Sequence, residues 1–147
     1  MFLSGSIFGL RQLNRDGIKA AGMKRCFGFC LQPIESWSRY PEIAMTLDFL
    51  RDLEPAARGL DLGSPKMMSL YLSAQNDIHI QATDIWPTAL EEVGVLIDCN
   101  KDQFRGDITL SIADATDLNG YETGSQDFVY STSVLEHIED FENVLVA

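Results

Sequence analysis

The sequence has no excess of basic residues. Its 147 residues include 11 Lys and Arg but 22 Asp and Glu. The formal net charge of -11 argues against a general nucleic-acid binder, which needs Lys and Arg to neutralise phosphates. The charge is uneven, since residues 1–32 carry five basic residues against Asp16 alone. Such a basic arm can contact a membrane surface, a nucleic acid or an anionic substrate, although a solvated helix face is the commoner explanation. We therefore expect no nucleic-acid partner.

The sequence also lacks a long apolar run and is poor in cysteine. No apolar stretch approaches the roughly 20 residues of a membrane span, so no transmembrane segment is predicted. Met1–Leu10 has no basic residue before its apolar part, which small polar residues interrupt, and this does not fit a secretory signal. Three cysteines cannot all pair internally, and Cys26 and Cys30 on one helix face fall short of the four ligands of a structural zinc site. We expect no bound metal and a reducing, cytoplasmic location.

A length of 147 residues is enough for one domain with a sizeable core. Residues 1–36 are the least patterned part, and we interpret them as a basic helical or flexible N-terminal segment. Residues 37–147 form the predicted domain. Its first helix has Pro41 in the first turn, carries an apolar stripe that covers the sheet, and stops at Glu54 because a proline follows. The stripe consists of Ile43, Leu47, Leu50 and Leu53.

From Arg58 onward the pattern alternates between strands and helices. The strand candidates are Arg58–Leu62, Ile78–Thr83, Ile108–Ala113 and Asp127–Ser131. Helices are predicted after Pro65 and from Trp86 to Ile97. This alternation requires a mainly parallel sheet with right-handed crossovers, so the fold class is α/β, with a Rossmann-like sheet and flanking helices. We predict the strand order 3-2-1-4, with the mixed third strand at an edge of the sheet.

A residue suited to ligand binding follows each of the four predicted strands. Gly63 lacks a Cβ, so cofactor atoms can approach the backbone in the turn after the first strand. Asp84 ends the second strand about 20 residues later, where a carboxylate can accept hydrogen bonds from a ribose diol. Asp114 follows the third strand, and Ser131 ends the fourth. Each Asp taken singly is better explained as a cap or turn residue, whereas their joint placement favours a nucleoside site.

Together these residues resemble the class I S-adenosylmethionine-dependent methyltransferases, over roughly residues 41–147. The family's first motif looks like Leu60-Asp61-Leu62-Gly63-Ser64, its adenine-side motif like Ala113-Asp114-Ala115, and its fourth-strand signature like the run from Asp127 to Ile138. The resemblance implies that S-adenosylmethionine is the cofactor and that Asp84 takes both ribose hydroxyls. It also implies that Asp114 accepts from the adenine amino group while the Ala115 amide donates to the ring. One departure is that Pro65 and Lys66 stand where the family usually has further glycines.

The resemblance also implies a set of residues at the site and a chemistry. The cofactor-binding residues are expected to be Asp61, Gly63, Ser64, Asp84, Ile85, Asp114, Ala115 and Ser131. The acceptor is expected to be a small molecule. Methyl transfer depends mainly on alignment, because the sulfonium is already activated, and a base is needed only where the acceptor must lose a proton. His137 is a weak candidate for that base, since its surrounding string Leu135–Ile138 favours a structural role at a helix start.

Two other functions stay open. A strand, a Gly turn and an acid about 20 residues later also fit an NAD-dependent dehydrogenase, but its Gly-x-Gly-x-x-Gly motif would lie on Gly63–Met68, which has one glycine. A non-catalytic or truncated nucleoside-binding module is the third possibility. The chain stops at Phe141–Ala147, whereas the family continues with three further strands, so we expect an incomplete methyltransferase fold with Phe128–Tyr130 at an edge. We expect residues 1–147 alone to self-associate through this edge and to show no methyl transfer.

Overall fold

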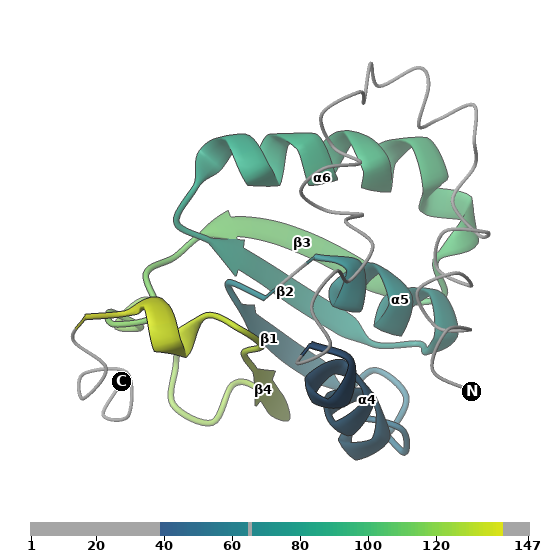
Figure 1. The fold of residues 1–147 in the computed structure, drawn as a ribbon. Helices are drawn as coiled ribbons and strands as arrows, with labels where there is room; N and C mark the ends of the chain where they lie inside the picture. Colours follow the sequence, from purple (N-terminus) through teal and green to yellow (C-terminus); the bar gives the residue numbers. More distant parts are fainter. Residues whose placement is uncertain (1–38, 65, 140–147) are drawn as a thin grey trace.

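A computed structural model of the chain describes residues 39–64 and 66–139 (Figure 1). Several sequence predictions lie outside these residues. They are the basic segment 1–36 with Cys26 and Cys30, Pro65 in the first turn, and the segment 141–147. Among the helices of the described ranges, none has the length and apolarity that a membrane span requires.

Four parallel strands form one sheet in the order β3-β2-β1-β4, which confirms the predicted strand order. The strands are β1 (Arg58–Leu62), β2 (His79–Asp84), β3 (Asp107–Ile112) and β4 (Phe128–Tyr130). In the register of the sheet, Asp61 lies beside Ala82 on one side and beside Tyr130 on the other. All four strands therefore present their carboxyl ends at the same edge of the sheet, where ligands bind in open α/β folds.

The connections between these strands are helical where the sequence predicts helices. Helix α5 (Met67–Gln75) follows β1, and α6 (Pro87–Asn100) follows β2 with its proline in the first turn. A short 3₁₀ helix η1 (Lys101–Gln103) extends α6, and η2 (Leu135–His137) follows β4. Proline suits the start of α6 because its missing N–H would have no partner within the helix.

The helix before the sheet, α4 (Arg39–Phe49), is shorter than predicted. The sequence suggests that it continues to Glu54, but the Leu50 amide makes the last bond of α-helical spacing, to the Thr46 carbonyl at 3.0 Å. Leu50 is buried in the core, and the chain turns there. Leu53 then packs against the same core from the turn instead of from a continued helix. Both leucines thus contact the core although the helix has ended, which shows that an apolar stripe does not by itself set the length of a helix.

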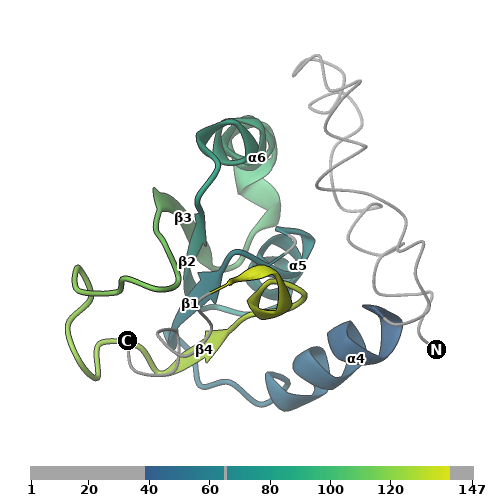
Figure 2. The ribbon, with the colours of Figure 1, turned by 60° about the vertical axis from the view of Figure 1, so that its left-hand side comes forward.

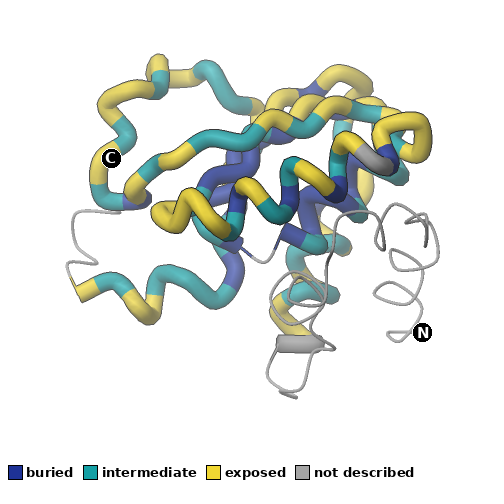
Figure 3. Tube along the Cα trace, turned by 90° about the horizontal axis from the view of Figure 1, so that it is seen from above, coloured by how far each residue is buried: buried dark blue, intermediate teal, exposed yellow. Residues whose placement is uncertain are grey.

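The helices cover one face of the sheet. Figure 2 shows α4 and α5 on one side and the long connection from β3 to β4 on the other. Successive side chains of a strand point to opposite faces of the sheet. Those on the face covered by the helices belong to two core clusters. One cluster packs Leu110 against α5 and α6 through Leu70, Val93 and Leu96. The other contains Met68, Leu72, Ile78, Ile80, Ala82 and Tyr130. Figure 3 shows these buried segments at the centre, surrounded by exposed chain.

The opposite face of the sheet divides into an apolar half and a polar half. Leu60 and Leu62 of β1 pack under residues of the β3–β4 connection and of the segment after β4, namely Ala115, Leu118, Tyr121 and Ile138. Over β2 and β3, in contrast, the Gln81 amide donates to the Ser111 hydroxyl at 2.9 Å. The apolar core on this face is therefore confined to the part of the sheet over β1.

We propose that β4 mediates self-association with a second copy of the chain. Within residues 39–64 and 66–139, β4 pairs with β1 alone, and Val129 is 54% exposed on it. Strand edges with apolar side chains pair with other chains, and an added lysine prevents this. We expect Val129→Lys to shift a concentration-dependent oligomer toward monomer in sedimentation velocity. Thr109→Lys, on the exposed polar edge strand β3, is the matched control and should change nothing. Equal association of both variants and the wild type would argue against β4 as the interface.

Candidate functional site

The turn after β1 has the backbone geometry that the sequence predicts for a ligand-binding turn. Gly63 has φ +71°, a left-handed conformation that side chains disfavour. Its amide donates to the Thr83 carbonyl of β2 at 3.1 Å. A Cβ at Gly63 would lie 3.0 Å from Cγ1 of Val134, which comes from the segment after β4. Glycine at this position therefore allows β1, β2 and the segment after β4 to converge on one turn.

Asp61 is fully buried beneath this turn, and its oxygens organise it. Oδ1 accepts from the Ser64 amide at 2.9 Å, and Oδ2 accepts from the Ser69 hydroxyl of α5 at 2.5 Å. Burial raises the pKa of Asp61, while the nearby Lys66 ammonium and the hydrogen bonds oppose that rise. Asp61 therefore acts from below, by holding the turn against α5.

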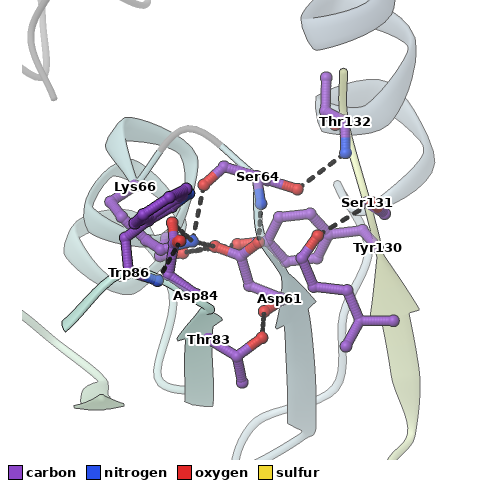
Figure 4. A network of polar contacts seen from close by, with 11 residues as sticks. Asp61, Ser64, Lys66, Thr83, Asp84, Trp86, Tyr130, Ser131 and Thr132 are labelled. Carbon is purple, nitrogen blue, oxygen red and sulfur yellow. Dashed lines mark hydrogen bonds and ion pairs between the residues drawn. The ribbon is translucent and has the colours of Figure 1, made fainter. Parts of the chain in front are cut away.

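Lys66 places a second buried charge in the turn, which is the main feature that sequence reasoning missed. Its side chain is only 3% exposed, and its Nζ donates to the Ser64 carbonyl at 2.7 Å. The same Nζ lies 3.5 Å from Oδ2 of Asp61 and 3.9 Å from Oδ2 of Asp84. Figure 4 shows Lys66 between these two carboxylates. A lysine in a run where the family has glycines is the sequence signal that could have indicated this pairing.

Residues of β4 and of the segment after it bind to the turn from the other side. The Thr132 amide donates to the Ser64 hydroxyl at 2.8 Å, and the Ser131 hydroxyl donates to the Leu62 carbonyl at 2.9 Å (Figure 4). Tyr130 lies 2.8 Å from the Ser69 hydroxyl. Because that hydroxyl gives its proton to Asp61, Tyr130 must be the donor in this bond. Burial, followed by the nearby Asp61, raises the pKa of Tyr130 well above its ordinary value, so it stays a protonated donor.

Asp84 stands at the rim of the site, at the carboxyl end of β2. It is partly exposed, and its Oδ1 accepts from the Trp86 amide at 3.0 Å. The two residues that follow are apolar and open to solvent, with Ile85 at 55% and Trp86 at 65% exposure. Thr83 faces the other way and donates to the Asp61 carbonyl at 2.7 Å. The end of β2 therefore combines a carboxylate with exposed apolar surface, as a nucleoside site requires.

Asp114 and Ala115 follow β3 at the same edge of the sheet. The Ala113 amide donates to the Asp84 carbonyl at 3.3 Å, which joins the ends of β2 and β3. Asp114 is exposed, and its Oδ1 accepts from both the amide and the hydroxyl of Thr116. These two bonds, the amide first, lower the pKa of Asp114. Ala115 is buried against the apolar half of the sheet face.

The structure brings the predicted site residues to one edge of the sheet, but it divides them by exposure. Asp84, Ile85 and Asp114 are accessible, whereas Asp61, Ser64 and Ala115 are buried. Gly63 and Ser131 lie between these extremes. His137 belongs to η2, with its side chain 70% exposed and its Nε2 3.8 Å from the Glu136 carboxylate.

Comparison with known proteins identifies the family of this chain. A family model described as a methyltransferase domain matches residues 60–147, which is more than half of the chain. The chain therefore belongs to the methyltransferase domain family. The match covers the last three residues of β1 and all of β2, β3 and β4, and it supports the methyltransferase interpretation of the motifs over the dehydrogenase alternative. No curated protein matches the chain.

Solved structures resemble this chain in fold. A Glu-to-Gln mutant of the protein MtNAS matches with a TM-score of 0.52 at 16% identity, over 84% of this chain and 45% of its own. A protein described as a sarcosine dimethylglycine methyltransferase from Galdieria sulphuraria matches with a TM-score of 0.49 at 22% identity, over 62% of this chain and 34% of its own. This chain thus spans less than half the length of either structure. At 16% identity, the similarity to the MtNAS structure concerns the fold alone.

Proposed function

We propose that this domain binds S-adenosylmethionine and transfers its methyl group to a small-molecule acceptor. The observation that carries the proposal is the convergence of Gly63 and Asp84 at adjacent ends of parallel strands, within the region matched by the methyltransferase family. Gly63 presents backbone without a Cβ, and Asp84 presents a partly exposed carboxylate. The residues present therefore fit a nucleoside that carries a short charged tail.

Each residue of the site has a distinct task in this proposal. Asp84 accepts hydrogen bonds from the ribose hydroxyls, and Ile85 provides apolar surface for the base. Asp114 accepts from the adenine amino group, and the backbone of Ala115 donates to the ring. Asp61, Ser64 and Ser131 hold the turn through the bonds described above and support the site from beneath.

The bound cofactor would supply an activated methyl group on a sulfonium, so the chain's own residues need chiefly to bind, orient and exclude water. A side-chain base is required only for an acceptor that must lose a proton. His137 stays our candidate for that role. Its imidazole is 70% exposed, and its Nε2 lies 3.8 Å from the Glu136 carboxylate.

We expect Asp84→Ala to weaken binding of S-adenosylmethionine by about 1 to 3 kcal/mol, because the ribose hydroxyls lose a charged acceptor. Isothermal titration calorimetry on the full protein chain measures this change. Asp107→Ala is the matched control, since Asp107 is an exposed carboxylate at the opposite end of the neighbouring strand and should bind as the wild type does. Preference of the wild type for a nicotinamide dinucleotide, or equal binding by the two variants, would contradict the proposal.

A further inference from the structure

We propose that Lys66 sets the charge preference of the cofactor site, by lowering its affinity for a sulfonium relative to a neutral thioether. This inference rests on the proposed function and concerns which form of the nucleoside the same site retains. The geometry behind it is the buried arrangement in which one ammonium stands between the carboxylates of Asp61 and Asp84.

The charges of these three residues determine the electrostatic field at the site. Asp61 is fully buried and Lys66 is 3% exposed, so water screens them poorly. With both carboxylates ionised, two negative charges and one positive charge leave the cluster with a net charge of about minus one. With Lys66 removed and Asp61 still ionised, the same site would carry about minus two, and a bound cation would be held more strongly. Lys66 therefore offsets part of the attraction that the two carboxylates would otherwise exert on a cationic ligand.

The covalent structure of S-adenosylmethionine links its sulfur to the ribose that Asp84 is proposed to bind. The sulfur of S-adenosylmethionine is attached to the 5′ carbon of the ribose whose hydroxyls Asp84 is proposed to bind. Nζ of Lys66 lies 3.9 Å from Oδ2 of Asp84, so the ammonium stands beside the carboxylate that is proposed to hold this ribose, and its field acts on the bound sulfonium. S-adenosylhomocysteine has the same groups except the methyl and its positive charge. The ratio of the two affinities therefore reports the electrostatic field of the site, because contacts common to both ligands cancel, and its change on replacing Lys66 reports the part that Lys66 contributes.

Two single variants of this cluster are expected to shift the affinity ratio in opposite directions. Lys66→Met removes the positive charge from a side chain of similar length. Asp61→Asn removes a negative charge but keeps an Oδ1 acceptor for the Ser64 amide. The double variant removes both charges and restores the net charge of the wild type. Removing a buried pair together is also milder for the fold than removing one partner.

The test is competition calorimetry on the full protein chain at pH 8, with S-adenosylmethionine and S-adenosylhomocysteine as probes. We expect Lys66→Met to shift the affinity ratio about tenfold toward S-adenosylmethionine, Asp61→Asn to shift it toward S-adenosylhomocysteine, and the double variant to match the wild type. Circular dichroism confirms that each variant is folded, and should Lys66→Met not fold, the Asp61→Asn and double variants decide the question. If the wild type binds both probes but the affinity ratios of Lys66→Met and Asp61→Asn stay within about twofold of the wild-type ratio, the inference about Lys66 is wrong and the proposed function stands. If the wild type binds neither probe, the proposed function itself fails.

Discussion

Asp61→Ala is expected to lower the free energy of unfolding by about 3 to 5 kcal/mol, because it leaves the buried Lys66 ammonium without its nearest carboxylate. The same change removes the acceptor of the Ser64 amide and of the Ser69 hydroxyl, both of which lie in the buried interior. Urea unfolding followed by circular dichroism measures the loss.

A double variant separates the effect of the unpaired charge on stability from the effect of the lost hydrogen bonds. In Asp61→Ala/Lys66→Met the ammonium is gone together with the carboxylate, so we expect it to recover a substantial part of the lost stability. If the double variant is instead as unstable as Asp61→Ala, the loss arises from the hydrogen bonds to Ser64 and Ser69, and the buried ion pair contributes little.

Gly106→Ala is expected to destabilise the domain by about 3 kcal/mol, because a Cβ at this position has no room. It would lie 2.1 Å from the Ile78 carbonyl oxygen, which is backbone and cannot rotate away. That same oxygen accepts from the Asp107 amide at 2.9 Å, so a shift of the chain here disturbs the pairing of β3 with β2. Thermal unfolding monitored by circular dichroism should show a clearly lower midpoint.

Gly120→Ala is the matched control, since a Cβ there meets nothing within 4 Å. We expect it to change stability by less than about 0.5 kcal/mol. Similar midpoints for the two variants would mean that the chain next to Gly106 relaxes freely, and would contradict the close packing of β2 and β3 at this end.

The strands and their order follow from the sequence because the relevant signals are local and mutually consistent. Apolar runs separated by helical segments admit a parallel sheet with right-handed crossovers, and this restricts the topology to few choices. The predicted Arg58–Leu62 agrees with β1, and the other strands differ from the prediction by a residue or so at their ends. The length of α4 could not be predicted in the same way, because its apolar stripe continues into a turn that also packs against the core.

The site was only partly predictable for a related reason. The placement of Asp84 and Asp114 at one edge of the sheet could be predicted because the ends of parallel strands share that edge, so their positions in sequence imply their positions in space. Asp61 was expected to contact the cofactor, but its complete burial and its bonds to Ser64 and Ser69 define it as a support of the turn. The sequence does not show whether a side chain lies above or below a turn, since that depends on what packs against it.

The sequence by itself determined the α/β class, the parallel order of the strands and the edge where the site residues meet, because periodicity and strand-end residues encode these locally. Only the tertiary structure decided how the charges of the site are arranged. Lys66 is near Asp61 in sequence, but Asp84 reaches it through the pairing of β1 with β2, and Tyr130 reaches Ser69 through the pairing of β1 with β4. These contacts join residues that are far apart in the chain, and their energies depend on burial, which only the packed sheet and helices create.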